Sequence, residues 1–273
     1  MPGPVLKARK GDTLVVSFTN SLGEPTTIHW HGLRIPSLMD GTEDVQKPVQ
    51  PGETFEYRFV LPDAGTYWYH PHFNEPTQLE RGLYGALVVE DPNDPTVDAD
   101  RLFLIDDMKL TKGNKFKQPG WFLARWMERH DGREGETLLI NGKEQPVIEV
   151  NAGQQERWRF ANTSSARYIL LHLGGEPFQV IGTDGGLLEK PYSVTEVLVT
   201  PGERYDVIAG PFEVGETLAI EALPFNRGPK ESERLKLATI SVGDRKPSIA
   251  FIPENLRLIE PLASQDTSAN KTI

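Results

Sequence analysis

Two pairs of histidines are the residues in this sequence whose type and spacing could do chemistry. His29 and His31 stand one residue apart in "TTIHWHGLR", and His70 and His72 repeat the spacing in "GTYWYHPHFN". The chain has six histidines, so most of them fall into these two motifs. Both motifs lie in stretches rich in threonine, tyrosine and tryptophan, which are typical of strands. Strand side chains alternate between faces, so each pair shares a face, with Cα atoms about 7 Å apart.

Two imidazoles on one face of a strand can bind one metal ion or two neighbouring ions. Neutral imidazole suits copper, zinc, iron and nickel, and copper(II) binds most tightly among the divalent ions of this row. A single such pair is more often surface decoration or a packed polar group. Because two pairs occur close together in strand context, the sequence predicts that His29, His31, His70 and His72 hold a metal centre.

The composition limits the class of protein that can hold such a centre. The 273 residues include 25 glycines and 22 prolines, with 38% hydrophobic residues, which is typical of a folded chain of short strands and many turns. The net charge of −10 leaves no basic excess to neutralise phosphates, so nucleic acid is not an expected partner. The sequence has no cysteine, which excludes disulfides and thiolate ligands within it. No apolar run of about 18 residues occurs, so no membrane span is expected.

Short strands between turn signals must position the histidines. Segments such as "TLVVSFTN", "TFEYRFVL" and "YGALVVED" are bounded by "KGD", "QPGE" and "PDAG", and together they predict an all-β sandwich architecture. The chain length favours two domains. Around residues 121–129 the sequence is compatible with a short helix. The expected divisions are a first domain at 1–92, a connector at 93–136, a second domain at 137–245 and a linker or tail at 246–273.

An internal repeat supports two domains of one kind. The motif "PGE" begins at Pro51 and again at Pro201, and the same 150-residue offset separates Gly65 from Gly215. The second copy has apolar residues wherever the first has a candidate ligand: Leu171, Leu173, Ile220 and Ala222. His172 corresponds to Trp30 and is predicted on the opposite face, as a structural or surface histidine.

The quoted segments also resemble a known family. "TTIHWHGLRIPSLMDG", "QPGETFEYRFVLPDAGTYWYHPH" and "QLERGLYGALVVED" are similar to the first cupredoxin domain of the multicopper oxidases, which include laccases and bacterial cuprous oxidases. "FQVIGTDGGLLEKP" and "VTPGERYDVI" resemble the second domain of that family, which normally carries no copper. The resemblance covers nearly the whole chain and implies two tandem cupredoxin-like Greek-key β-sandwich domains.

The resemblance implies a role for each candidate residue. In the family the first histidine of "HWHG" binds the type 2 copper and the second binds a type 3 copper, which gives these roles to His29 and His31. Both histidines of "HPH", His70 and His72, then bind the type 3 pair. Asp40 in "MDG" matches an acidic residue that orients water and assists proton delivery, although an aspartate before glycine is equally typical of a plain turn. The implied partners are dioxygen and a small reducing substrate.

The sequence departs from the complete three-domain members of the family. Those members take the remaining histidines, and the cysteine of the type 1 copper, from a third cupredoxin domain, whereas this sequence has no cysteine. The expectation is therefore half of a trinuclear copper site and no type 1 site, completed by a third domain in the same polypeptide or another chain. A histidine surface left uncovered near Trp30, Trp68 and Phe73 would favour a homo-oligomer.

Three functions from different classes remain open at this stage. The chain is the N-terminal two-domain portion of a copper-dependent oxidase, a copper-binding module without turnover on its own, or a structural module with a vestigial site. The N-terminal residues "MPGPVLKARKGD" lack the basic and apolar blocks of a secretory signal peptide. A periplasmic or secreted location is implied by the family resemblance alone.

Overall fold

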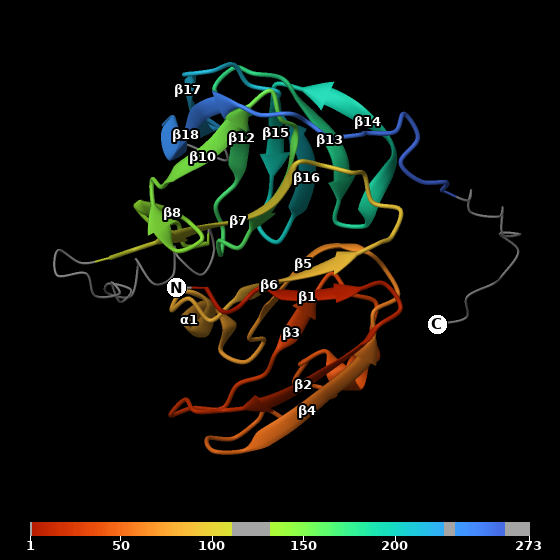
Figure 1. Ribbon diagram of the computed structural model, residues 1–273. Coiled ribbons are helices and arrows are strands. Elements are labelled where there is room, and N and C mark those ends of the chain that lie inside the picture. The colour runs from red at the N-terminus through yellow and green to blue at the C-terminus, as the bar shows by residue number, and fades with distance from the viewer. Residues whose placement is uncertain (1, 111–131, 227–232, 260–273) are drawn as a thin grey trace, which may run out of the picture.

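The computed structural model describes residues 2–110, 132–226 and 233–259. Regular structure in these ranges is almost entirely β-strand, arranged as two β-sandwich units that lie one above the other (Figure 1). The prediction of an all-β chain with tandem sandwiches is confirmed. No helix in the described ranges is long and apolar enough to cross a membrane. The predicted short helix at 121–129 lies outside these ranges, as does His130.

We call the part from β1 to β6 the first unit and the part from β7 to β18 the second unit. The elements of the first unit are β1 (Leu6–Arg9), β2 (Thr13–Thr19), β3 (His29–His31), η1 (Ser37–Met39), β4 (Thr54–Val60), β5 (Gly65–His70), α1 (Glu75–Leu79) and β6 (Gly85–Glu90). The strands of the second unit are β7 (Ala99–Met108), β8 (Thr137–Ile140), β9 (Lys143–Glu144), β10 (Val147–Ala152), β11 (Glu156–Asn162), β12 (Ile169–Leu173), β13 (Phe178–Thr183), β14 (Gly186–Val194), β15 (Glu196–Val199), β16 (Arg204–Ala209), β17 (Thr217–Leu223) and β18 (Leu235–Arg245).

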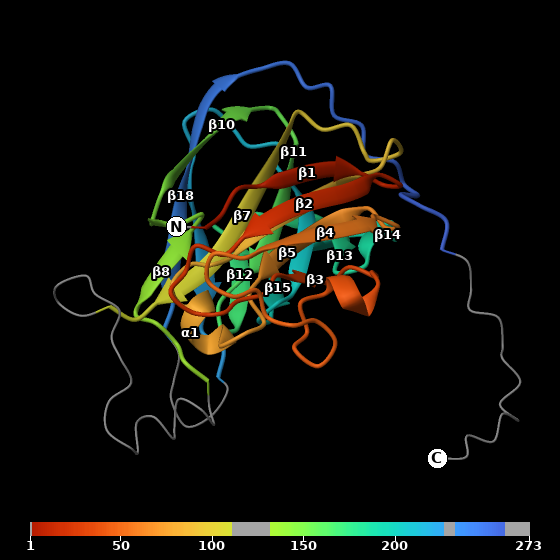
Figure 2. The same cartoon turned by 90° about the horizontal axis from the view of Figure 1, so that it is seen from below.

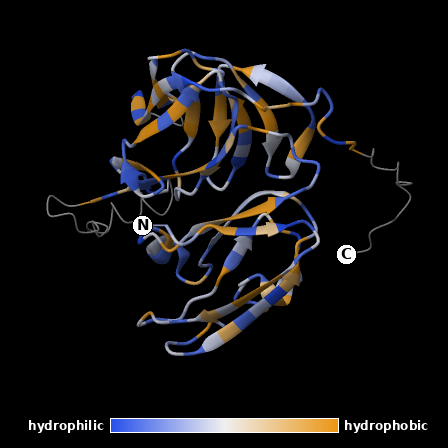
Figure 3. Ribbon diagram, viewed as in Figure 1, coloured by the Kyte–Doolittle hydropathy of each residue, from blue (hydrophilic) through white to orange (hydrophobic). Residues whose placement is uncertain are grey.

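The first unit packs a four-stranded sheet, in the order β1-β6-β5-β3, against the antiparallel pair β2-β4. Along β4, exposed side chains alternate with more buried ones, and bands of differing hydropathy are visible along this strand (Figure 3). Trp30, Tyr57, Phe59 and Tyr67 fill the space between the two layers, and all are at most 3% exposed. This core holds β3 and β5 rigidly, and these are the strands that carry the histidines.

The second unit is larger and packs a seven-stranded sheet against a five-stranded sheet. The strand orders are β14-β13-β16-β11-β7-β8-β9 and β10-β18-β17-β12-β15. Trp158, Phe160 and Phe178 lie between the layers and are at most 2% exposed. Leu171, Leu173, Ile220 and Ala222, the counterparts of the histidine positions, belong to this cluster, so the second copy uses those positions for core packing.

Residues 93–136, expected as a connector, contain a long strand. β7 pairs in parallel with β11 and antiparallel with β8, so it lies inside the seven-stranded sheet. The strand is buried on both faces over residues 103–107, so it shows no alternation, and Asp106 and Asp107 interrupt its apolar run. Residues 99–108 are therefore a strand of the second unit and not part of a connector.

The repeat seen in the sequence extends to individual hydrogen bonds. Gly52 N–H donates to the carbonyl of Asn20 at 2.8 Å, and Gly202 N–H donates to the carbonyl of Asn162, also at 2.8 Å. The Asn20 side-chain amide then donates to Val49 O, as the Asn162 amide does to Val199 O. A buried asparagine thus ties the end of one strand to a "PGE" turn in each unit.

The two units meet at a buried polar interface. Thr66 of β5 donates its hydroxyl to Asp206 of β16 at 2.6 Å, and Arg159 Nη1 donates to Thr66 Oγ1 at 3.0 Å. Arg157 adds a 2.6 Å contact to Asp206. Seen from below, the first unit lies across the sheet that contains β7 and β11 (Figure 2). Since buried charged groups are costly unless paired, this network specifies how the units dock.

Candidate metal centre

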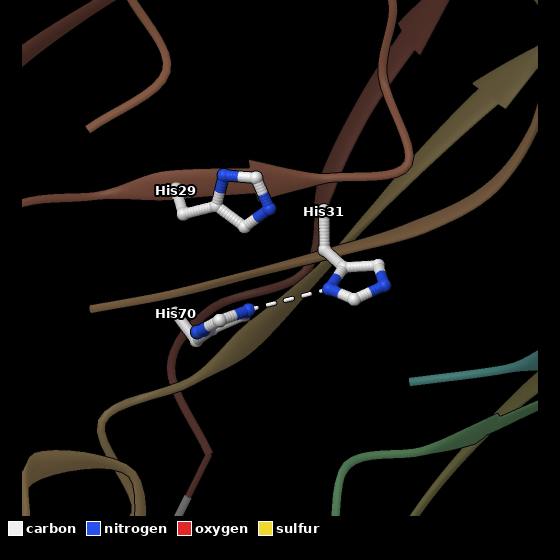
Figure 4. A group of neighbouring side chains, drawn as sticks. All are labelled: His29, His31 and His70. Atoms are coloured by element: carbon white, nitrogen blue, oxygen red, sulfur yellow. Dashed lines mark hydrogen bonds between the residues drawn. The ribbon is translucent and has the colours of Figure 1, made fainter. Parts of the chain in front are cut away.

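Three of the four predicted ligands converge where β3 pairs with β5. His29 lies directly opposite His70 in the antiparallel register, and His31 follows two residues later on the same face. One ring nitrogen from each of the three histidines lies within 4.8 Å of the other two (Figure 4). The ring centroids are 5.1 to 5.6 Å apart. The strand pair therefore gathers side chains that are about 40 residues apart in the chain.

The fourth predicted ligand lies beside this group. His72 follows β5, and its side chain is exposed. Its ring centroid is 5.2 Å from that of His29 and 6.4 Å from that of His70. The backbone N–H of His72 donates to Thr27 Oγ1 at 3.2 Å, which holds the turn close to β3. His72 is thus adjacent to the cluster without belonging to the group of nitrogens within 4.8 Å.

The tautomer of His70 follows from its hydrogen bond. Its Nδ1 lies 2.8 Å from the carbonyl oxygen of Pro71, and because a carbonyl can only accept, Nδ1 carries the proton. Nε2 then carries the lone pair, which accepts a hydrogen bond from Nδ1 of His31 at 3.3 Å (Figure 4). His70 is 4% exposed, and this burial lowers its pKa to about 3. His70 is therefore a neutral imidazole, the form that binds metals.

Asp40 orients His29. Nδ1 of His29 lies 3.1 Å from the backbone oxygen of Asp40 and 3.0 Å from its carboxylate Oδ1. The ring therefore donates from Nδ1 and presents Nε2 to the cluster. Burial lowers the pKa of His29, but the contacts with Asp40 raise it more, so the net pKa lies above the ordinary value. Asp40 Oδ1 is buried and accepts no hydrogen bond of good geometry, which leaves it available to a further donor.

His31 faces the second unit. Burial lowers its pKa to about 4, and the positive charge of Arg204, from β16, acts in the same direction. Arg204 is 3% exposed. No local pattern marks Arg204 or Gly202 as part of the site, and the only sequence signal is that the first copy of the repeat reads "PGET" where the second reads "PGER".

Aromatic rings close the inner side of the site. Trp68 stacks on His70 with ring centroids 4.3 Å apart and lies 4.9 Å from His31. Trp30 and Trp68 are 1% and 3% exposed, and Phe73 is half-buried. The expectation that these residues form an uncovered apolar surface is wrong for both tryptophans, because each packs inside its own chain. Neither tryptophan therefore offers an apolar surface for self-association.

The donor set fits a transition-metal ion. Three imidazoles offer converging nitrogens, and backbone or carboxylate contacts at Nδ1 fix two of the rings, an arrangement typical of histidine ligands. In the described part of the chain this is the one such group of histidine and acidic side chains. His172 lies elsewhere, with Nδ1 3.2 Å from Glu221 Oε2, in keeping with its predicted structural role.

Tandem cupredoxin-like sandwiches with a histidine cluster in the first unit define a class of copper protein, and comparison with known proteins identifies the family. Models of the multicopper oxidase family match residues 1–94 and 110–221. A multicopper oxidase of Mycobacterium tuberculosis is 36% identical over 287 aligned positions, covering 94% of this chain and 54% of that protein. One from Staphylococcus aureus is 33% identical, covering 76% of this chain and 46% of its own length. The chain belongs to the multicopper oxidase family.

Solved structures agree with this assignment. The crystal structure of a multicopper oxidase from Pseudomonas thermotolerans aligns with a TM-score of 0.81 at 34% identity, covering 95% of this chain and 61% of that one. A Campylobacter jejuni multicopper oxidase, described as a metallo-oxidase, aligns with a TM-score of 0.83 at 32% identity, covering 96% of this chain and 55% of that one. The chain thus spans about half the length of the curated relatives it matches.

Proposed function

We propose that this chain supplies half of the trinuclear copper site of a copper-dependent oxidase, which oxidises a small substrate one electron at a time and reduces dioxygen to water. The observation that carries the proposal is the convergence of the His29, His31 and His70 nitrogens within 4.8 Å. Membership of the multicopper oxidase family selects copper among the metals that imidazole suits. Copper, when bound, supplies one-electron chemistry and a place for dioxygen.

The protein's own residues have distinct roles in this proposal. His29 takes the type 2 position, and His31, His70 and His72 take type 3 positions. Pro71 O and Asp40 hold the Nδ1 protons of His70 and His29, so that Nε2 of each ring is free to bind. The buried Oδ1 of Asp40 would accept a hydrogen bond from a water molecule in the site and so orient it. Trp68 excludes water from the inner face of His70.

The remainder of the copper site must come from elsewhere. Four histidines cannot satisfy three copper ions, so we infer that a third cupredoxin domain, in the same polypeptide or in another chain, contributes the other ligands and the type 1 copper. A chain that spans 54% of its Mycobacterium relative is consistent with this division. The family resemblance also favours export to the periplasm or beyond. On its own, the chain is then a copper-binding module.

Copper content per chain tests the metal part of the proposal. The purified protein should bind Cu²⁺, and His29→Ala or His70→Ala should lower the affinity by at least about ten-fold, because each removes a ligand. His172→Ala is the matched control, since His172 pairs with Glu221 outside the cluster and should leave binding unchanged. Equal binding by the His70→Ala variant and the control would reject the proposed site.

Oxygen consumption tests the catalytic part. With copper loaded and a phenolic donor or Cu⁺ supplied, turnover should require the third domain, added as a separate chain or present in a longer polypeptide. Robust consumption by the two-unit chain alone would contradict the half-site assignment. Firm copper binding without turnover in any longer form would support the alternative, a copper-binding module.

A further inference from the structure

We propose that the second unit, which lends no predicted ligand to the site, positions His31 through the Pro201-Gly202-Glu203 turn and Arg204. The inference deepens the proposed function. It is tested by histidine NMR and by Cu²⁺ affinity, and only the second of these measurements rests on the proposed function. The second unit would then help to position a ligand, although it has apolar residues at every position where the first unit has a candidate ligand.

Gly202 lies directly against the imidazole of His31. Its φ is +83°, and a Cβ at this position would lie 3.0 Å from Cε1 of His31 and 3.1 Å from Nε2. Contacts this short require the neighbour to move by a few tenths of an ångström. The ring has little room for such a movement, because its centroid lies 4.9 Å from that of Trp68 and its Nδ1 lies 3.3 Å from His70 Nε2. The absence of a side chain at position 202 therefore sets where His31 can sit.

Arg204 anchors this turn to the first unit. Its Nε donates to Thr66 O at 2.9 Å, its Nη1 to Gly202 O at 3.0 Å and its Nη2 to Asp184 O at 3.0 Å. One guanidinium thus joins β5, which carries His70, to the turn that faces His31. Glycine at position 32 suits this approach as well, since its φ is +87° and a Cβ there would overlap Arg204 Nη2. Gly202 thus packs against the ring of His31, and Gly32 packs against the guanidinium of Arg204.

The internal repeat shows that this contact is not a requirement of the turn itself. Pro51-Gly52-Glu53 has the same sequence, a φ of +82° at Gly52 and the same hydrogen bond to an asparagine carbonyl. A Cβ at Gly52 would meet nothing within 4 Å. The residue that follows is Thr54, whose exposed hydroxyl bonds Thr19. The two turns therefore share one geometry, but of the two, within the described residues, the Gly202 turn alone lies against a histidine of the cluster.

This pair of turns provides a matched experiment. Gly202→Ala and Gly52→Ala carry the same backbone strain, and the first alone adds an atom against His31. In the metal-free protein, histidine side-chain NMR should show the His31 ring signals shifted in Gly202→Ala and unchanged in Gly52→Ala. The Cu²⁺ affinity of Gly202→Ala should be about ten-fold lower than that of the wild type, as is typical when a residue that orients a metal ligand is replaced. Gly52→Ala should bind Cu²⁺ like the wild type.

A second pair of variants keeps the test decisive if Gly202→Ala does not fold. Arg204→Lys preserves the charge but loses the fork that joins Thr66 O, Gly202 O and Asp184 O. Arg101→Lys is the control, because it loses a comparable fork to Glu156 and Glu149 O that does not involve Thr66 or the Gly202 turn. His31 signals should move in Arg204→Lys and stay in Arg101→Lys. Identical His31 signals in both members of each folded pair would overturn the inference. Absence of Cu²⁺ binding by the wild type would instead reject the proposed function, and the NMR result would still decide the positioning role.

Discussion

At the scale of single residues, the site depends on how each imidazole is held as much as on its presence. His70 bonds Pro71 O, His29 contacts Asp40, and His31 packs against Gly202, so three different neighbours fix three rings. Partners of this kind set the tautomer and orientation of a metal-binding histidine. Replacing a neighbour should therefore weaken metal binding without removing a ligand.

Asp40→Asn tests this view at the residue that the sequence marked as catalytic. The variant keeps the backbone carbonyl that accepts from His29 but loses the carboxylate charge 3.0 Å from Nδ1. We expect Cu²⁺ affinity to fall by up to about ten-fold, measured by competition with a chelator of known affinity. Asp63→Asn weakens a surface pair with Arg34 that includes no residue of the cluster, and it should not change the affinity. Equal affinities for the two variants would count against a role for Asp40 at the site.

At the scale of elements, each unit depends on an asparagine that joins a strand to its turn. The Asn162 amide donates to Arg167 O at 2.7 Å and to Val199 O at 2.9 Å, and Oδ1 accepts from Ser164 at 2.6 Å. Asn162 is fully buried, so no water can replace these bonds. It also accepts from Gly202 through its carbonyl, and thereby connects the core of the second unit to the turn beside His31.

Asn162→Ala should therefore destabilise the fold strongly. Loss of several buried hydrogen bonds, with their partners left unsatisfied, predicts a decrease of about 3 kcal/mol in the free energy of unfolding. Urea denaturation of the metal-free protein measures this. Asn93→Ala removes one exposed bond to Asp91 and should cost less than about 0.5 kcal/mol. A loss as small for Asn162→Ala as for Asn93→Ala would contradict the structural role.

At the scale of the whole molecule, a buried acid links the two units. Tyr84 of the first unit donates its hydroxyl to Asp106 Oδ2 of β7 at 2.7 Å, and Asp106 is 5% exposed. Burial raises the pKa of Asp106 from its ordinary value of 3.8 to about 7, with a further contribution from the charge of Asp107. The folded chain therefore binds a proton at Asp106 over a pH range in which the unfolded chain does not.

This difference predicts how stability varies with pH. Because the pKa is raised in the folded state, the contribution of Asp106 is complete below about pH 4 and is lost as pH rises towards 7. Asp106→Asn should remove a slope of up to about 1.4 kcal/mol per pH unit between these values. Unfolding by urea at pH 5 and pH 7.5 gives the comparison, with Asp44→Asn at an exposed position as the control. An unchanged slope in Asp106→Asn would show that its pKa is not raised.

The class of fold, the repeat and the candidate ligands could all be predicted from the sequence, because these depend on local patterns. Alternating strands, "PGE" turns and the two-residue spacing of His29 and His31 follow from backbone geometry that acts over a few residues. Loss of the histidines in the second copy is equally visible in the linear sequence. The multicopper oxidase resemblance rested on the same motifs, and the family assignment is confirmed.

Which side chains meet at the site could not be predicted from the sequence, because it depends on how distant segments pack. Strand register places His29 opposite His70, packing buries Trp30 and Trp68, and docking of the units brings Gly202 and Arg204 to His31. The sequence did not predict β7 as a strand, because buried acidic residues interrupt its apolar pattern. One of them, Asp106, is paired with Tyr84, which lies outside the segment. Contacts of this kind join residues far apart in the chain, and their energy depends on burial and distance, which no local pattern encodes.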